Sequence, residues 1–339
     1  MKRLAFLGAM NRDLVADIAG DVVLKKLKID APPLIETPIT DALAEKGARL
    51  LGDIGAADYL GGSAFNAARV AALLNSASEA LSLSFFGTAG TVEDGAPHLA
   101  ALADWHVSSE AVRQSPLPPA TCLAMVESAG RTLLTATGAN AGIADYLRDQ
   151  SGDIARRLAA SDVVHITSFL DPASPGLVAA LLDNVRQLNP DIVVSLDPGA
   201  AWIIPGGEGF AKLLAQTDIL HLNNEEFAHF GSDDEAIAAL GARLHSANWL
   251  IVARNHLGVA LHWGRADQSL ETNALPETPL PASVLDSTGA GDTFCGAFLW
   301  HFCTNPAHPL DAARHGFTLA RAKIAINGPL TKDVLASLR

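Results

Sequence analysis

Short apolar runs alternate with longer amphipathic stretches along most of the chain, and this alternation restricts the fold more than any other feature. Apolar runs of strand length lie at residues 4–8, 81–86, 163–169, 192–196, 219–222, 250–253 and 259–263. Helical periodicity marks residues 63–75, with Ser63 as the expected N-cap, and residues 93–105, 175–188, 233–245, 291–303 and 310–326. Such alternation predicts an α/β fold with a doubly wound, mainly parallel central sheet flanked by helices.

Two regions interrupt this alternation, at about residues 15–60 and 107–137. Within the second region, strand-like runs at 121–127 and 131–136 are joined by Ser-Ala-Gly at 128–130, which predicts a hairpin. We expect the two regions to form a small β-sheet beside a single domain that spans residues 1–339. A mobile cover over an active site is one use for such a sheet, and surface insertions without a role are the alternative.

The composition excludes several classes of protein. With 49% hydrophobic and 18% charged residues the chain can bury a large core, which argues against disorder. A net charge of -13 repels polyanions, so we expect no nucleic-acid partner. Its 3 cysteines match neither a disulfide framework nor a zinc site. The apolar run at 4–8 is too short for a signal peptide, and no run approaches the roughly 18 residues of a membrane span, so we expect a cytoplasmic protein.

The most informative segment is DSTGAGDTF at residues 286–294. Gly289, Ala290 and Gly291 let the backbone approach a ligand closely, and an apolar helix follows at once. The unpaired N–H groups and positive dipole end of that helix would bind a negatively charged oxygen. A transferring phosphoryl group needs such donors, because negative charge spreads over its peripheral oxygens.

Asp292 lies within this group of donors, and a carboxylate repels a bound phosphate. Its presence is explained if it accepts a proton from an attacking hydroxyl group, as a general base does. The structural alternative is that Asp292 caps a helix beginning at Thr293.

The segment resembles the second signature of the ribokinase (PfkB) family, Asp-Thr-x-Gly-Ala-Gly-Asp, with Ser287 at the usual threonine. Further resemblances follow the family's order: GAMNRD at 8–13, GGSAFNAA at 61–68, GAN at 138–140 and NNEE at 223–226. They span nearly the whole chain. The resemblance implies a ribokinase-like fold with a small β-sheet lid, and transfer of the γ-phosphate of ATP to a hydroxyl of a sugar.

On the acceptor side, the resemblance implies side chains that bind substrate hydroxyls and glycines that allow close approach. These residues are Asn11, Asp13, Gly61, Gly62, Asn66 and Asn140. Each also has a purely structural interpretation, as part of a turn or of a glycine-rich helix entry.

On the nucleotide side, the resemblance implies that Asn223 and Glu226 bind Mg²⁺ and phosphate, since Mg²⁺ prefers oxygen ligands and keeps several waters. Gly258, with the glycines of the late motif, would contact the nucleotide. Asp286 would help to bind a monovalent cation such as K⁺. The alternative for Asn223 and Glu226 is an ordinary helix start.

Some positions depart from the family pattern. Ribokinases usually carry lysine where this chain has Ser63, and the nucleotide-side Thr-x-Gly-x-x-Gly is replaced by ARNHLG at 253–258. The residues Asn11 and Asp13 suit a polyol, so a sugar is the favoured acceptor, with a nucleoside kinase of the same family as the alternative. Relatives often dimerise through the small sheet, so a homodimer stays open.

Functions outside this chemistry are less well supported. The chain lacks Gly-x-Gly-x-x-Gly after its first strand, which argues against a nicotinamide-dependent oxidoreductase, and it lacks the P-loop motif. A catalytically silent sugar-binding regulator on the same fold remains an alternative, because fold does not determine function.

Overall fold

The computed structural model describes residues 1–127, 130–246, 248–264, 269–281 and 284–337. Its larger sheet has the strand order β14-β13-β12-β11-β10-β9-β1-β5-β6. These strands, in that order, are Leu270–Ala274, Val259–Gly264, Leu250–Arg254, Ile219–Asn223, Val193–Asp197, Val163–Thr167, Lys2–Leu7, Leu81–Ala89 and Val107–Gln114. In this spatial order, the seven neighbouring strands β12, β11, β10, β9, β1, β5 and β6 pair in parallel. At one edge, β13 pairs antiparallel with both β12 and β14.

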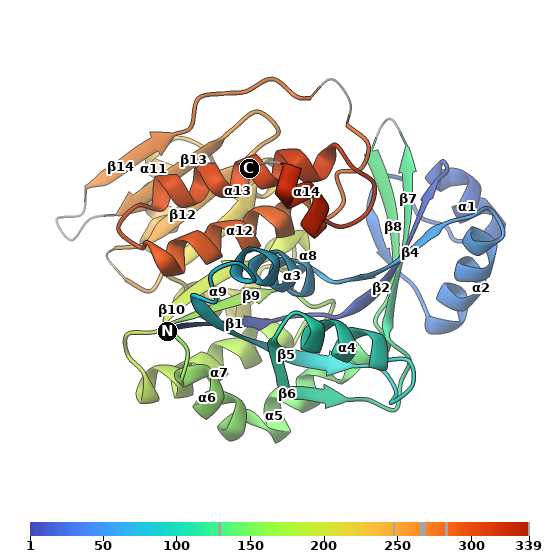
Figure 1. The fold of residues 1–339 in the computed structure, drawn as a ribbon, viewed down its shortest axis with the longest axis horizontal. Helices are drawn as coiled ribbons and strands as arrows, with labels where there is room; N and C mark the ends of the chain where they lie inside the picture. The colour runs from blue at the N-terminus through green and yellow to red at the C-terminus, as the bar shows by residue number, and fades with distance from the viewer. Residues whose placement is uncertain (128–129, 247, 265–268, 282–283, 338–339) are drawn as a thin grey trace.

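Helices cover both faces of this sheet (Figure 1), so apolar side chains fill two separate layers. One layer is packed by α3 (Ser63–Asn75), α4 (Ala96–Asp104), α12 (Ala290–Thr304) and α13 (Pro309–Ile324). The other is packed by α5 (Ile143–Asp149), α6 (Ser151–Ala159), α7 (Ser174–Leu188), α8 (Gly199–Ile203), α9 (Gly207–Leu214) and α11 (Asp234–Gly241). The remaining helical segments are η1 (Gly138–Gly142), α10 (Asn224–Phe230) and α14 (Lys332–Ser337). The predicted doubly wound architecture is confirmed.

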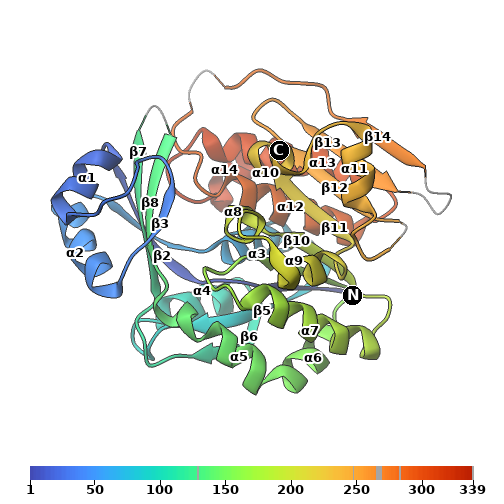
Figure 2. The same cartoon turned by 180° about the vertical axis from the view of Figure 1, so that it is seen from behind.

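The smaller sheet stands at one side of the large one (Figures 1 and 2) and has the order β3-β8-β7-β2-β4. Its strands, in that order, are Glu36–Pro38, Gly130–Ala136, Ala120–Glu127, Asn11–Asp17 and Ala57–Gly61. Helices α1 (Gly20–Leu27) and α2 (Asp41–Gly52) bury one face of it with Leu and Val side chains. The predicted hairpin is present as β7 and β8, and Ser128 and Ala129 lie outside the described residues.

The boundaries of the two inserted regions differ from the expectation. Residues 107–114 form β6 and pair with β5 at the edge of the large sheet, so the second region joins the small sheet only from Ala120 onward. The small sheet also begins earlier than residue 15, because β2 starts at Asn11.

Three predicted helix ends were wrong for local reasons. Gly62, at φ 103°, is the N-cap of α3, and Ser63 is already helical, so its hydroxyl does not cap the helix. Helix α4 begins only at Ala96, where Pro97 suits the first turn. Helix α11 ends at Gly241, which packs against the Trp249 ring. In the described part of the chain, no helix is long and apolar enough to cross a membrane.

Helices α3 and α12 pack closely, and this contact fixes the position of the late glycine motif. Gly296 of α12 lies against the carbonyl oxygen of Ala67, and a Cβ atom at Gly296 would overlap that oxygen and lie 2.9 Å from Val70 Cβ. The two helices can approach this closely only because residue 296 has no side chain.

We therefore predict that Gly296→Ala forces α3 and α12 apart and lowers the free energy of unfolding by about 1–3 kcal/mol, as measured by denaturant titration. Gly152→Ala in α6 is the control, because its nearest neighbour would be Arg156 Nη1 at 3.7 Å. There the helix propensity of alanine should stabilise the protein by up to about 1 kcal/mol. Equal effects of the two substitutions would contradict this packing.

Candidate active site

Asp292 lies in the first turn of α12, which begins at Ala290 with Gly289 as its N-cap. Its Oδ2 accepts a hydrogen bond of 2.9 Å from Asn66 Nδ2 on α3. The proposed alternative, a cap for a helix starting at Thr293, is wrong, because the helix starts before Asp292 and the carboxylate bonds across to another helix. Burial raises the pKa of Asp292, although the bond from Asn66 opposes this shift. A carboxylate of raised pKa is better matched to accept a proton near neutral pH.

Of the three backbone N–H groups predicted as donors, that of Ala290 is already used. The N–H of Ala290 donates to Ser287 O at 3.2 Å and closes the turn before the helix. The N–H groups of Gly291 and Asp292 belong to the first helical turn, where no preceding turn offers a carbonyl. Gly289 has a φ of 73°, a left-handed conformation that favours glycine. No side chain caps this end of the helix, so its first N–H groups have no side-chain acceptor.

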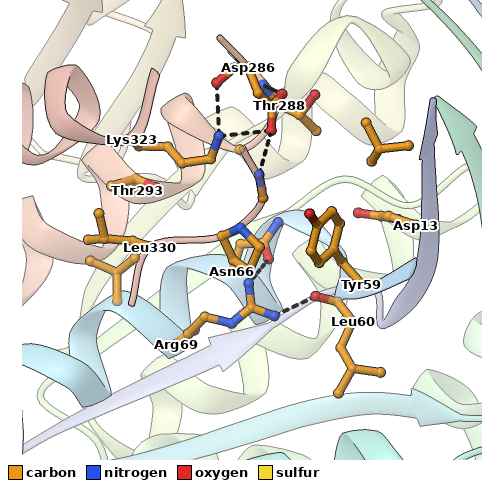
Figure 3. Close-up of a pocket in the computed structure, with 15 residues that line it drawn as sticks. Asp13, Tyr59, Leu60, Asn66, Arg69, Asp286, Thr288, Thr293, Lys323 and Leu330 are labelled. Atoms are coloured by element: carbon orange, nitrogen blue, oxygen red, sulfur yellow. Dashed lines mark hydrogen bonds and ion pairs between the residues drawn. The ribbon is translucent and has the colours of Figure 1, made fainter. Parts of the chain in front are cut away.

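A cleft lies beside the start of α12, and Thr288, Gly289 and Thr293 are among the residues that line it. Figure 3 shows Asp13 of β2, Tyr59 of β4 and Asn66 of α3 around it, with the start of the late motif at its far side. In the described residues, Asp13 Oδ1 is buried without a hydrogen-bond partner. Gly61 lies against the Asp13 carboxylate, which a Cβ atom at this position would overlap. The predicted approach of Gly61 to a substrate stays a prediction.

Arg69 is a residue of this cleft that the sequence analysis missed. It is only 8% exposed, and its guanidinium donates to Asn66 Oδ1 at 3.0 Å and to the carbonyl of Leu60. Because Oδ1 of Asn66 is held by Arg69, the Nδ2 group is directed at Asp292. Burial lowers the pKa of Arg69 to about 10, so it stays charged at neutral pH. The signal was available: Arg69 follows Asn66 by three residues, on the same face of a helix.

Asn140 holds Asn11 in place. Its Nδ2 donates to Asn11 Oδ1 at 3.1 Å, and its own Oδ1 accepts from Thr88 at 3.1 Å. Asn140 is 7% exposed, which fits a positioning role better than substrate contact. Gly62 also has a structural contact, since a Cβ atom at this position would overlap the carbonyl of Ala9.

A second group of charged residues lies where adjacent parallel strands β10, β11 and β12 end. Arg254, the last residue of β12, donates from Nη2 to Asp197 Oδ2 at 2.9 Å and from Nη1 to Gly291 O at 3.2 Å. Its guanidinium therefore links the carboxyl edge of the sheet to the start of α12. Ligands bind at this edge in open α/β sheets. The sequence analysis noted Arg254 only as a departure from the family pattern.

The buried histidines and cysteines make contacts within the core. His165 and His221 are fully buried, and their ring nitrogens lie 3.0 and 3.1 Å from the hydroxyl of Ser195. Cys295 and Cys303 are unpaired and buried on α12. Cys295 nonetheless contacts the charged residues at the strand ends, because its Sγ lies 2.8 Å from Arg254 Nη1.

Comparisons with known proteins identify the family and the fold. The model of the pfkB family carbohydrate kinases matches residues 56–331. The chain belongs to this family. An uncharacterized sugar kinase of Archaeoglobus fulgidus is 28% identical over 219 residues, which are 64% of this chain and 82% of that protein. Membership makes the chain a phosphotransferase with an alcohol group as acceptor, and it implies ATP as donor, generally with Mg²⁺.

Solved structures show the same ribokinase-like fold. Adenosine kinase of Anopheles gambiae has a TM-score of 0.78 at 19% identity, covering 96% of each chain. A probable sugar kinase of Rhizobium etli has a TM-score of 0.78 at 20% identity, covering 99% of this chain and 98% of that one. Ribokinase of Giardia lamblia has a TM-score of 0.72 at 17% identity, covering 100% of both.

In this pfkB-family kinase, Asn223 and Glu226 form a capping box at the start of α10. Asn223 Oδ1 accepts from the N–H groups of Glu225 and Glu226 at 2.9 Å, so the amide oxygen is already used. Burial and the negative charge of Asp197 raise the pKa of Glu226 to about 7. Such a carboxylate gains by facing a cation, so Glu226 fits a water-mediated Mg²⁺ contact and Asn223 fits a supporting role. Among the described residues, no three metal-binding side chains converge.

The turn that carries Gly258 is shaped by Asn255 in place of a glycine. Asn255 Oδ1 accepts from the N–H groups of Leu257 and Gly258 at 2.7 Å, and the N–H of Asn255 donates to Gly258 O at 3.0 Å. The side chain thus closes a tight turn beside the strand edge. Gly258 itself is buried.

Burial, together with the negative charge of Asp292, raises the pKa of Asp13 from 3.8 to about 7. Between about pH 4 and pH 7 the folded protein therefore holds a proton at Asp13 that the unfolded chain has lost. The contribution of Asp13 to the free energy of unfolding thus falls as the pH rises through this range. We predict that Asp13→Asn is more stable than the wild type at pH 8 by about 1–3 kcal/mol, and that this difference in the free energy of unfolding is smaller at pH 5. Denaturant unfolding at both pH values checks this.

Asp17→Asn, at the exposed end of the same strand, is the control and should show no such pH dependence. An Asp13→Asn variant that is less stable than the wild type at pH 8 would show that the buried carboxylate is not under electrostatic strain.

Proposed function

We propose that this chain transfers the γ-phosphate of ATP to a hydroxyl group of a sugar bound in the cleft between α3 and the small sheet. The observation that carries the proposal is the position of Asp292. Its carboxylate lies in the first turn of α12 and is hydrogen-bonded to Asn66, which lines the cleft. The base is thus one hydrogen bond away from a residue that lines the cleft, and Gly289, the N-cap of the same helix, lines the cleft as well.

The arrangement supports one sequence of bond changes. The acceptor oxygen attacks the γ-phosphorus of ATP, the bond to the leaving ADP oxygen breaks, and the hydroxyl proton passes to Asp292. The N–H groups of Gly291 and Asp292 would stabilise the negative charge on the transferring phosphoryl group. Glu226 would hold Mg²⁺, which supplies further positive charge.

A sugar fits the cleft better than a nucleoside. Polar side chains, among them those of Asp13, Asn66 and Arg69, suit the hydroxyl groups of a polyol. Of the lining residues, Tyr59 alone is aromatic, and a purine base is usually held between apolar or aromatic faces. A nucleoside kinase, the activity named for several structural neighbours, is therefore the second candidate.

The small sheet would act as a lid on a single domain. Asp13 and Tyr59 lie on its strands β2 and β4, so movement of this sheet would carry acceptor-binding residues toward Asp292 and exclude water. A cytoplasmic location and a homodimer formed through the small sheet remain predictions.

Asp292→Asn tests the proposed base. An amide cannot accept the proton, so we predict that kcat for ADP formation falls by about 10²–10⁴-fold while the protein stays folded. The assay couples ADP release to a panel of sugars and nucleosides. Asp311→Asn is the control, because Asp311 also lies in the first turn of a helix, α13, but is exposed; its activity should not change.

Two outcomes would contradict the proposal. If Asp292→Asn and the wild type released ADP at equal rates, Asp292 would not be the base. If calorimetry showed tight binding of a sugar with no turnover, the chain would be the silent binding protein considered above.

Glu226→Gln tests the metal side. The amide oxygen can still accept from the N–H of Asn223 and keep the helix cap, but the charge that would hold Mg²⁺ is lost. We predict that the Mg²⁺ concentration for half-maximal activity rises by about 3-fold or more, with little change in thermal stability. The neighbouring Glu225→Gln, with an exposed carboxylate, is the matched control. Equal Mg²⁺ dependence of both variants would remove Glu226 from the metal site.

A further inference from the structure

Lys323 is a buried cation directly behind the late glycine motif. It lies near the end of α13 and is only 2% exposed. Its Nζ donates to the backbone oxygen of Asp286 at 2.8 Å and to Asp286 Oδ2 at 3.0 Å (Figure 3). Neither periodicity nor spacing predicted a buried lysine here, because lysine on a helix normally faces water.

The family resemblance implied a monovalent cation at Asp286, and the residues present do not fit one. A cation at Asp286 would be bound by its backbone and carboxylate oxygens, and the ammonium of Lys323 already bonds to one of each. Oδ2 also accepts from the N–H of Gly328 at 3.2 Å, and Oδ1 accepts from the N–H of Thr288 at 2.8 Å. The positive charge that Asp286 needs is thus supplied by the chain itself.

The bonds around Asp286 connect Lys323 to the phosphate-binding turn. The carboxylate holds the N–H of Thr288, which immediately precedes the N-cap Gly289. On the other side, Leu285 N–H donates to Ile324 O at 2.8 Å, so the segments before the motif and after α13 are tied together. A charge lost at Lys323 would leave Asp286 buried and unpaired, and the turn would lose its support.

We propose that Lys323 is a positioning residue whose ammonium takes the place of a monovalent cation behind the anion-binding turn, so that this kinase works without K⁺. The inference rests on the proposed function, since it concerns the support of the same site. It goes beyond that function in assigning the source of the positive charge. If the side chain were absent, a K⁺ ion would find the backbone oxygen of Asp286 without the lysine, and Oδ2 bonded only to the N–H of Gly328.

The experiment compares the wild type, Lys323→Ala and Lys323→Met in buffers of equal ionic strength containing KCl or tetramethylammonium chloride. The wild type should change by less than about twofold on removal of K⁺, because its cation is covalently attached. Lys323→Ala should lose activity by about 10-fold or more without K⁺ and regain much of it with K⁺. Lys323→Met should lose activity in both salts, because its side chain fills the space without a charge. Lys332→Ala, an exposed lysine of α14, should match the wild type.

Thermal unfolding provides a readout that needs no substrate. K⁺, but not tetramethylammonium, should raise the unfolding temperature of Lys323→Ala and leave that of the wild type unchanged, because an ion that binds only the folded state stabilises it. If no acceptor were phosphorylated, the proposed function would fail while this measurement still tested the cation site.

The inference is overturned by either of two results. One is a wild type whose activity or unfolding temperature depends on K⁺ at physiological concentration. The other is a Lys323→Ala variant that is as active or as stable without K⁺ as with it. The measurement on the wild type still tests the proposal even if the lysine variants fail to fold.

Discussion

The hydrogen bond from Asn66 to Asp292 joins the first turns of α3 and α12, and the geometry of the whole site depends on it. Both helices start at a glycine N-cap in a conformation with positive φ, so neither start is occupied by a capping side chain. Gly296 lets the helices approach closely enough for the bond to form. Helix packing therefore determines where the carboxylate meets the acceptor cleft.

Charge is balanced separately on each side of this bond. On the acceptor side, Arg69 offsets the negative charges of Asp13 and Asp292. On the nucleotide side, Arg254 offsets Asp197 and Glu226. Behind the turn, Lys323 offsets Asp286. Each carboxylate group has a buried or half-buried cation next to it, as expected where negative groups are gathered in a region of low dielectric constant. Arg254 with Asp197 and Lys323 with Asp286 form direct ion pairs, whereas Asp13 and Glu226 keep raised pKa values.

The sequence predicted the doubly wound sheet and the residues at the chain's turns because both follow from local pattern. The apolar run of β9 and the GAGD turn can each be recognised from a few consecutive residues. Arg254 and Lys323 were not assigned because their partners are distant in sequence: Lys323 meets Asp286 only after α12 and α13 have packed together. Arg69 was missed although its partner Asn66 lies only three residues away. The N-cap of α3 was misplaced at Ser63, because the left-handed conformation of Gly62 is set by its contact with Ala9.

The most direct test is a crystal structure with ADP, Mg²⁺, aluminium fluoride as a mimic of the transferring phosphoryl group, and an acceptor identified by ADP release. The mimic should lie against the N–H groups of Gly291 and Asp292. The acceptor hydroxyl should lie about 2.6–3.2 Å from the Asp292 carboxylate. A mimic bound away from the start of α12, or an acceptor hydroxyl out of reach of Asp292, would show that this carboxylate does not take the proton.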